Sequence, residues 1–244
     1  MDYDKLPCVS ICMPTWNRNN FKPLILQNIM GINYPKDKLE FVIDDDGEDK
    51  FIKNKKEFDF IQNIIKPIKL NYNYYNNKRS IGAKRNNLTK LASHKYIACM
   101  DSDDIYMPDY VLYGICELLK GNYGCVGSNQ MLFVYPYDEF KTHAIRCSAK
   151  RQIHEATMIY TKKHHRSMGG FICRGKQSSQ GEGCKMADFN EKNVGLLDID
   201  KCMCCVVHTG NTICKEMFKK DDNVIETTIH PQIKWTLCGC LGIK

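Results

Sequence analysis

The sequence of 244 residues lacks any apolar run near the roughly 18–20 residues that a membrane-spanning helix needs. Met1 to Lys5 are polar and partly acidic, and no apolar stretch typical of a secretory leader follows them. The sequence also has no internal repeat and no low-complexity linker, which favours one domain over a chain of modules. These absences predict a cytoplasmic protein without a membrane span. The abundance of Lys, Asn, Ile and Tyr is typical of an AT-rich coding genome, and a viral genome of that kind would place the protein in the host cytoplasm.

Paired C-x2-C knuckles, the spacing typical of a structural zinc site, are missing although the sequence has 14 cysteines. Cys202, Cys204 and Cys205 lie close together, but their spacing favours core or surface thiols over zinc ligands. In the expected cytoplasmic compartment these thiols would be reduced.

The charge balance lacks the strong basic excess of a nucleic-acid-binding protein. Lys and Arg number 35 and Asp and Glu 28, so the formal net charge is 35 − 28 = +7. This mild excess suits an anionic small ligand and predicts no nucleic-acid partner. With 43% hydrophobic and 26% charged residues, the chain has the composition of an ordinary globular protein.

Short apolar runs alternate with segments of helical spacing over the first 120 residues. The runs predict strands at residues 8–13, 39–43, 69–75 and 95–100. The spacing predicts helices at residues 21–30, 49–65, 82–93 and 110–120. This alternation predicts a parallel α/β sheet with crossover helices. Later strand-like stretches are less regular, at residues 124–135, 157–160 and 203–208.

Two acidic clusters follow predicted strands directly. Residues 44–46 are three aspartates after the second strand, and Asp101, Asp103 and Asp104 come after the fourth. In an open α/β sheet, ligands bind at the carboxyl ends of the strands, so both clusters should face one crevice. One cluster alone could be a solvated loop, but two in register favour a site for Mg²⁺ or Mn²⁺, which prefer oxygen ligands.

Basic residues lead into the predicted third helix. Lys78, Arg79, Lys84 and Arg85 surround a Gly at a helix start, where free backbone N–H groups favour an anion. The sequence lacks both G-x-G-x-x-G and G-x-x-x-x-G-K-[ST], which argues against a Rossmann dehydrogenase and a P-loop NTPase. Acidic residues that can bind a metal, together with basic residues that can bind phosphate, predict a nucleoside-diphosphate site.

Several ordered stretches resemble the motifs of family 2 glycosyltransferases with the GT-A fold. Residues 9–18 resemble the opening strand of that family, and residues 41–47 resemble the strand that ends in Asp-Asp-Gly. Residues 82–86 resemble the Gly-x-x-Arg-Asn helix start, and residues 97–104 resemble the D-x-D element. Residues 168–171 are similar to the Gly-Gly-Phe that precedes the acidic catalytic motif of the family.

The resemblance implies an α/β fold of GT-A type, with a mostly parallel Rossmann-like sheet flanked by helices. It implies a single domain over residues 1–244. The donor half would cover about 1–109, and a less regular acceptor half with the C-terminal tail would cover about 110–244. The donor would be a nucleoside-diphosphate sugar, with a UDP-sugar favoured, and the acceptor a glycan, a protein or a small molecule.

The resemblance also implies roles for particular residues. Pro14, Thr15 and Asn17 would line the nucleoside pocket, Asp46 would contact base or ribose, and Arg85 would lie near base or diphosphate. The full implied donor-binding set is Pro14, Thr15, Asn17, Arg18, Asp45, Asp46, Gly82, Arg85, Asp101 and Ser102. The implied ligands of Mn²⁺ or Mg²⁺ are Asp101, Asp103 and His208.

The catalytic base is where the sequence departs from the family pattern. Family members carry Glu-Asp after Gly-Gly-Phe, and the Asp deprotonates the acceptor hydroxyl. Here Glu182 is followed by Gly183, so Glu182 is the nearest carboxylate for that role, and Asp188 is the reserve candidate. The leading hypothesis is a metal-dependent, inverting glycosyltransferase.

Two alternatives stay open. The missing Asp at Gly183 is compatible with a nucleotide-sugar-binding module that has lost catalysis. Residues 43–47 also fit the Asp-x-Asp-Gly pattern of haloacid-dehalogenase-like phosphohydrolases, in which an Asp is phosphorylated beside Mg²⁺. That pattern normally ends the first strand and here ends the second, which weakens the phosphohydrolase interpretation.

Overall fold

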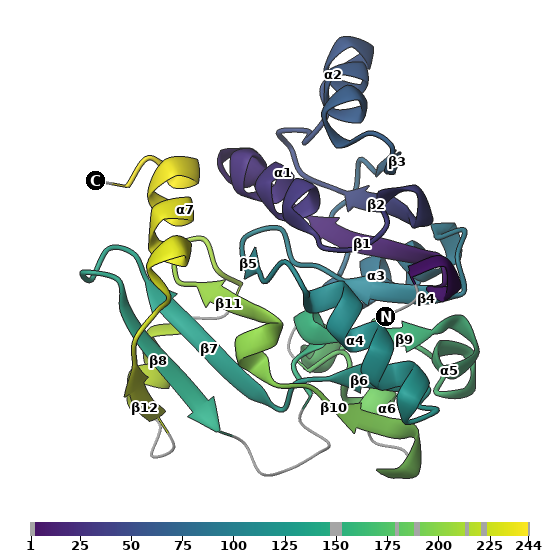
Figure 1. Cartoon of the computed structure of the whole chain (residues 1–244). Helices are drawn as coiled ribbons and strands as arrows, with labels where there is room; N and C mark the ends of the chain where they lie inside the picture. The colour runs from purple at the N-terminus through teal and green to yellow at the C-terminus, as the bar shows by residue number, and fades with distance from the viewer. Residues whose placement is uncertain are drawn as a thin grey trace.

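A computed structural model describes residues 3–146, 153–178, 181–187, 191–212, 215–220 and 224–243. Within these ranges the strands form two sheets (Figure 1). The larger sheet has the order β10-β6-β9-β4-β1-β2-β3, and the smaller has the order β12-β8-β7-β11-β5.

The strands of the larger sheet are β1 (Val9–Thr15), β2 (Leu39–Asp45), β3 (Lys69–Tyr74), β4 (Tyr96–Cys99), β6 (Cys125–Gly127), β9 (Ile159–Thr161) and β10 (Val194–Leu196). Those of the smaller sheet are β5 (Ile105–Tyr106), β7 (Gln130–Tyr135), β8 (Lys141–Arg146), β11 (Met203–Val206) and β12 (Val224–Thr227). The α-helices are α1 (Lys22–Gly31), α2 (Lys55–Ile65), α3 (Ile81–Leu91), α4 (Tyr110–Lys120), α5 (Lys162–Ser167), α6 (Cys184–Ala187) and α7 (Pro231–Leu241).

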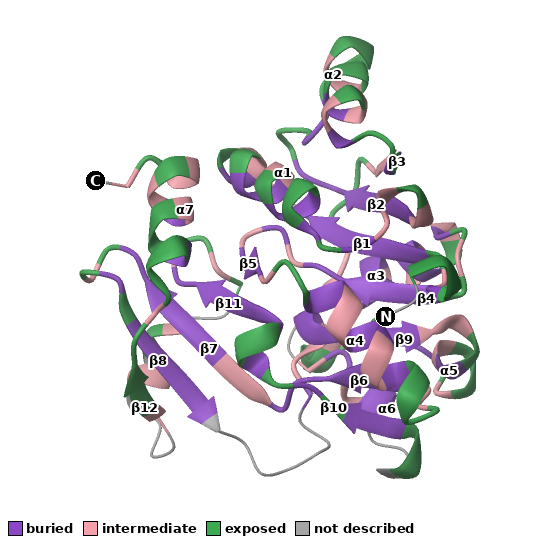
Figure 2. Ribbon diagram, in the orientation of Figure 1, coloured by how far each residue is buried: buried purple, intermediate pink, exposed green. Residues whose placement is uncertain are grey.

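The first half of the larger sheet confirms the predicted α/β architecture. β3, β2, β1 and β4 are parallel neighbours. Every residue of β1 and β2 is buried, as a continuous apolar run in a covered parallel sheet requires (Figure 2). α3 covers one face, and α1 and α4 contribute to the core on the other. Because the four strands are parallel, their carboxyl ends meet at one edge.

The described part of the second half contains more strands than the sequence predicts. The predicted strand at residues 124–135 is two strands, β6 and β7, which belong to different sheets. β9 runs antiparallel between β4 and β6, so the sheet is mixed. In the smaller sheet, β11 pairs with both β7 and β5 and so brings residues 203–206 next to the segment that follows β4.

The predicted helix at residues 49–65 begins later than expected. α2 starts at Lys55 because the side chain of Asn54 accepts a hydrogen bond from the Glu57 backbone N–H at 3.0 Å and caps the helix. The preceding loop is tied to β2, since the carboxylate of Asp45 accepts the backbone N–H of Phe51 at 2.7 Å.

No helix within the described ranges combines the length and the apolar character that a membrane crossing requires.

Candidate active site

The negative charges of the acidic segment after β2 are compensated by basic residues of the protein itself. Asp46 accepts hydrogen bonds from the Lys84 ammonium at 2.5 Å and from the Arg79 backbone N–H at 2.6 Å. Burial lowers the pKa of Lys84, and the charge of Asp46 opposes that shift. Asp44 is fully buried and is held by the side chains of Arg79 and Asn87.

Asp45 shapes the loop that follows it. Besides the Phe51 N–H, it accepts the Gly47 N–H at 2.9 Å and the Tyr72 hydroxyl at 2.7 Å. A Cβ at Gly47 would lie 2.7 Å from the backbone nitrogen of Asn17, whose own φ is +52°. Asp45, Gly47 and Asn17 therefore form a closely packed turn at the ends of β1 and β2.

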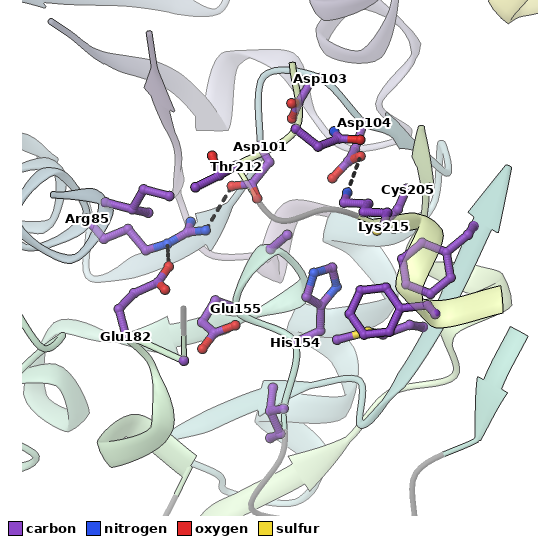
Figure 3. A pocket seen from close by; sticks show the side chains of 18 of the residues that line it. Arg85, Asp101, Asp103, Asp104, His154, Glu155, Glu182, Cys205, Thr212 and Lys215 are labelled. Atoms are coloured by element: carbon purple, nitrogen blue, oxygen red, sulfur yellow. Dashed lines mark hydrogen bonds and ion pairs between the residues drawn. The ribbon is translucent and has the colours of Figure 1, made fainter. Parts of the chain in front are cut away.

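The segment after β4 carries charges that face outward from the sheet. The guanidinium of Arg85 on α3 lies between two carboxylates, with Nη2 2.9 Å from Asp101 Oδ1 and Nε 3.0 Å from Glu182 Oε1 (Figure 3). Arg85 and Glu182 are each 4% exposed. Arg85 Nη1 is buried and has no hydrogen-bond partner among the described residues. Because unpaired buried donors are uncommon, this nitrogen is available to a ligand.

Asp103 lies where three segments of the chain meet. Its Oδ2 accepts from Arg18 Nε at 3.1 Å and pairs with His208 Nε2 at 3.0 Å. Burial alone would raise the pKa of Asp103, but the hydrogen bond from His208 and the charges of Lys215 and Arg18 outweigh it and lower this pKa. Arg18 also donates to the Gly210 carbonyl at 2.6 Å, which ties the 208–211 loop to the segment that follows β1.

The tautomer of His208 follows from the hydrogen bond at its second ring nitrogen. The Gly210 N–H donates to His208 Nδ1 at 3.1 Å, so the neutral ring carries its proton on Nε2 and donates it to Asp103. The ring also packs against Phe21, with centroids 4.6 Å apart. A metal on Nε2 would require the other tautomer and hence a turn of the Gly210 amide away from the ring.

Asp104 points inward and joins the smaller sheet to the site. It accepts the Val206 N–H at 2.9 Å, and the Lys215 ammonium lies 3.8 Å from its Oδ1. Burial raises the pKa of Asp104 to about 7, the charge of Lys215 opposes the shift, and Asp103 adds to it.

Two cavities meet at the segment after β4. The smaller, of about 90 Å³, is lined by Pro14, Thr15, Trp16, Arg18, Ile81, Lys84, Asp101, Ser102, Asp103 and Thr212. The larger, of about 490 Å³, shares Ile81, Asp101, Asp103 and Thr212 with it. It continues past Arg85, Glu182, Glu155 and His154 to an apolar end with Met131, Phe133 and Phe218.

Some predicted donor residues line these cavities and others do not. Pro14, Thr15, Arg18, Asp101 and Ser102 line the smaller cavity, and Arg85 lines the larger one. Asn17, Asp45, Asp46 and Gly82 line neither cavity. Of the predicted bases, Glu182 lines the larger cavity, and Asp188 lies outside the described residues.

The basic cluster is arranged differently from the sequence prediction. The charge of Lys84 is taken up by Asp46, and that of Arg79 by Asp44. Lys78 lies over the Trp16 ring, 3.5 Å from its centroid. Only Arg85 among these four cations borders the larger cavity, and Lys84 reaches the edge of the smaller one.

Sequence reasoning left three residues of the larger cavity without a role: Glu155, His154 and Lys215. Burial and the charge of Lys215 lower the pKa of His154 to about 4, so its imidazole is neutral near pH 7. Their positions depend on contacts between segments far apart in the chain, and no local motif marks them.

Solved structures share this arrangement of sheets. The mannosyltransferase PcManGT from Pyrobaculum calidifontis, in complex with GDP-Man and Mn²⁺, has a TM-score of 0.64 at 17% identity, over 99% of this chain and 71% of that one. S. aureus TarS 1–349 in complex with UDP-GlcNAc has a TM-score of 0.60 at 14% identity, over 84% of this chain and 60% of that one. The fold is that of the GT-A glycosyltransferases.

Sequence comparison then assigns the family. The family model described as glycosyl transferase family 2 matches residues 10–176, more than half of the chain, and the chain belongs to this family. The UDP-Glc:alpha-D-GlcNAc-diphosphoundecaprenol beta-1,3-glucosyltransferase WfgD of Escherichia coli is 32% identical over 137 residues, 52% of this chain and 51% of that protein. The chain spans about half the length of this relative.

Membership of this family overturns the phosphohydrolase interpretation of residues 43–47. The structure gives the physical reason, because Asp44 is fully buried and bound to Arg79 and Asn87, where no phosphate ester could reach it.

Proposed function

We propose that the protein is a metal-dependent, inverting glycosyltransferase that moves a sugar from a nucleoside-diphosphate sugar to an acceptor hydroxyl. The observation that carries this proposal is the junction of two cavities at Asp101 and Asp103. A protein that only binds a nucleotide sugar needs a place for the donor alone. Sugar transfer also needs a second place, beside the donor, for the acceptor.

The smaller cavity, of about 90 Å³, suits one part of the nucleoside diphosphate, such as a ribose or a phosphate group, and the rest of the donor would extend into the junction with the larger cavity. The hydroxyl oxygen of Thr15 is buried there without a hydrogen-bond partner among the described residues, so it can bind a polar group of the ligand. Asp101 is bound to Arg85 through Oδ1, and the described residues provide no hydrogen bond to its Oδ2. That oxygen is available to a ribose hydroxyl or a cation. A UDP-sugar is the favoured donor.

The residues around Asp103 fit a divalent cation. Asp103 provides carboxylate oxygens, and His208 can add a nitrogen once the Gly210 amide turns from the ring. Within the described ranges, no group of three or more His, Cys, Asp or Glu side chains is placed to hold a metal. The remaining ligands would therefore be diphosphate oxygens and water, as is common for Mg²⁺. When bound, Mn²⁺ or Mg²⁺ neutralises charge that develops on the leaving diphosphate.

The larger cavity suits the acceptor. Its apolar end holds the stacked rings of Phe133 and Phe218, with centroids 5.1 Å apart, which can pack against the apolar face of a sugar. Its polar end carries Glu182 and Glu155. Either carboxylate can take the proton from an acceptor hydroxyl while the bond between the donor sugar and the diphosphate breaks. A single displacement of this kind inverts the anomeric centre.

Calorimetry with UDP-glucose, UDP-N-acetylglucosamine and GDP-mannose, with and without Mn²⁺, tests the metal assignment. In Asp103→Asn we expect the Mn²⁺-dependent part of donor affinity to fall at least tenfold, equal to about 1.4 kcal/mol. In His208→Ala we expect a smaller loss. Donor affinity that is the same with and without Mn²⁺ in the wild type would contradict the metal-dependent mechanism.

A further inference from the structure

We propose that Glu155, not Glu182, takes the proton from the acceptor hydroxyl, a proposal that rests on the glycosyl transfer proposed above. Glu155 begins a 3-10 turn at Glu155–Thr157, far in sequence from the acidic segments at residues 44–46 and 101–104. In Figure 3 it lies between the side chains of Glu182 and His154, in the wall of the larger cavity.

The backbone around Glu155 is firmly held. The His154 N–H donates to the Ser128 carbonyl at 2.8 Å, and the Thr157 hydroxyl donates to the His154 carbonyl at 2.7 Å. The Tyr106 hydroxyl donates to the Ala156 carbonyl at 3.1 Å. A base held in this way keeps its carboxylate in one place, which general base catalysis requires.

Glu182 is already engaged. Its Oε1 is 3.0 Å from Arg85 Nε, and both side chains are almost fully buried. If Glu182 accepted a proton, the buried guanidinium would lose one of its two carboxylate partners, and breaking a buried ion pair is costly. Glu182 is therefore suited to hold Arg85 beside Asp101 and is a positioning residue.

Glu155 has no such partner among the described residues. Its Oε1 accepts the Gly183 N–H at 3.1 Å, and the structure describes no ion pair with a Lys or Arg. The side chain is half-buried, and its residue borders the cavity. Its remaining lone pairs can therefore accept a hydroxyl proton.

Gly183 is explained by Glu155. A Cβ at position 183 would lie 2.5 Å from Glu155 Cγ and 2.9 Å from Met158 Cε, too close for any real contact. The backbone of Gly183 is outside the left-handed region, so packing, not conformation, excludes a side chain there. The side chain of Glu155 fills the space beside position 183 and places a carboxylate in it.

The electrostatics agree with this geometry. Burial, and after it the negative charge of Glu182, raise the pKa of Glu155 to about 7, while Arg85 opposes the shift. The other titratable groups along the same cavity are Asp101, Asp103, Asp104, Lys215 and the neutral imidazole of His154. Asp104, whose pKa is also about 7, faces Lys215 and the Val206 N–H. A base with a pKa near the working pH combines ionised population with proton affinity.

The ionised Glu155 carboxylate takes the hydroxyl proton, and the hydroxyl oxygen forms a bond to the anomeric carbon of the donor. The bond from that carbon to the diphosphate oxygen breaks, and its electron pair leaves with the nucleoside diphosphate.

Donor hydrolysis, with water as the acceptor and Mn²⁺ present, tests the proposal through release of UDP or GDP from the three donors named above. Relative to the wild type, we expect Glu155→Gln to lower kcat about 10²–10⁴-fold and to leave Mn²⁺-dependent donor affinity within threefold. The wild-type kcat/KM should decrease as the pH is lowered below about 7, the acidic limb of its pH profile. In Glu155→Gln this decrease should shrink to the part contributed by Asp104, whose pKa is also about 7. In Glu182→Gln it should persist and move to lower pH, because the charge that raises the pKa of Glu155 is gone.

A second variant pair separates a catalytic role from a structural one. Glu155→Ala opens the space beside position 183, so the double variant Glu155→Ala/Gly183→Asp can carry a carboxylate there without the 2.5 Å contact. The remaining 2.9 Å contact is with Met158 Cε, the end of a flexible side chain that can shift. We expect the kcat of the double variant to be at least tenfold higher than that of Glu155→Ala. Gly183→Asp alone should be impaired because its side chain meets Glu155.

The outcomes are distinct. Wild-type hydrolysis with a Glu155→Gln variant that keeps kcat within threefold overturns the role of Glu155 and leaves the proposed function standing. Failure of the double variant to recover activity while it binds donor also overturns that role. Donor binding by the wild type without hydrolysis of any of the three donors contradicts both the role and the proposed function.

Discussion

At the residue scale, the site is governed by which carboxylate each cation compensates. Lys84 and Arg85 are neighbours on α3, yet one is bound to Asp46 and the other to Asp101 and Glu182. The first pair is almost fully buried and holds the ends of β1 and β2 to the helix. The second borders the cavity and can respond to a ligand.

The Lys84–Asp46 pair should contribute strongly to stability. Lys84→Met should lower the free energy of unfolding by about 3–5 kcal/mol, because the Asp46 side chain is fully buried and would lose its charge partner. Urea denaturation measures this loss. The matched control is Lys55→Met, whose pair with Asp59 is exposed and should matter by under about 0.5 kcal/mol. Equal, small losses in both variants would mean that Asp46 is solvated.

Glu155 should also make stability depend on pH. Its pKa in the folded state is about 7, above the ordinary value of 4.5, so the folded protein favours the protonated form. The stabilisation that protonated Glu155 gives to the folded state is fully present below pH 4.5 and is lost as the pH rises through about 7. Glu155→Gln should therefore match the wild type at pH 4.5 and exceed its stability at pH 8 by on the order of 1–3 kcal/mol.

Thermal unfolding at the two pH values checks this prediction. Asp104 also has a pKa raised to about 7, and it stays in the variant, so part of the pH dependence should persist. The control Glu117→Gln removes a partly exposed carboxylate and should change little at either pH. A Glu155→Gln variant less stable than the wild type at pH 8 would show that the ionised carboxylate is stabilised in the fold.

The sequence alone predicted the position of part of the site. Asp101 and Asp103 follow a buried strand, and their position at the sheet edge follows from that pattern. Glu155 carries no local signal, because its place depends on contacts with Gly183, 28 residues away, and on the ion pair between Arg85 and Glu182. The partners of Asp45 and Asp46 could not be predicted for the same reason.

At the element scale, α3 connects the two cavities. Ser80 caps the helix by accepting the Ala83 N–H at 3.3 Å, and Arg85 follows one turn later. The start of α3 packs directly on the segment after Phe171, where a Cβ at Gly82 would lie 1.8 Å from the Ile172 carbonyl oxygen. The Gly of the helix-start motif therefore permits a close backbone approach, which brings Glu182 and Arg85 together.

Gly82→Ala should disturb this contact. We expect a loss of about 1–3 kcal/mol in the free energy of unfolding, because helix or loop must move away from the new methyl group. The control is Gly31→Ala at the end of α1, where a Cβ meets nothing within 4 Å. Alanine there should be neutral or stabilising by up to about 1 kcal/mol. Urea denaturation of both variants is the measurement, and the same small change in both would contradict the close approach.

Most elements of the first half were predictable because each shows an apolar run or a helical period within its own sequence. β1, β2 and α4 fall within a residue or two of the predicted bounds. β8 and β12 were not predicted, since β8 contains Lys141 and His143 and β12 is largely exposed. Such short strands are fixed by pairing with each other, and a single strand does not show that pairing in its own sequence.

At the scale of the whole molecule, the chain brings residues from both halves to one junction. Asp101 and Asp103 come from the predicted donor half, and Glu155, Glu182, His208 and Lys215 come from the predicted acceptor half. β9 completes the sheet beside β4, and α7 packs against α1. We propose on these contacts that residues 1–244 form one domain, with the two cavities built jointly by the halves.

In the proposed mechanism the metal-bound donor is cleaved at this junction. The release of nucleoside diphosphate from UDP-glucose, UDP-N-acetylglucosamine and GDP-mannose is the direct test. With Mn²⁺ we expect turnover of at least one donor, its loss on chelation, and a reduction of at least 100-fold in Asp103→Asn. Glu117→Gln serves as the control and should keep wild-type turnover. Turnover that survives chelation or Asp103→Asn unchanged, or donor binding with no turnover at all, would contradict the account.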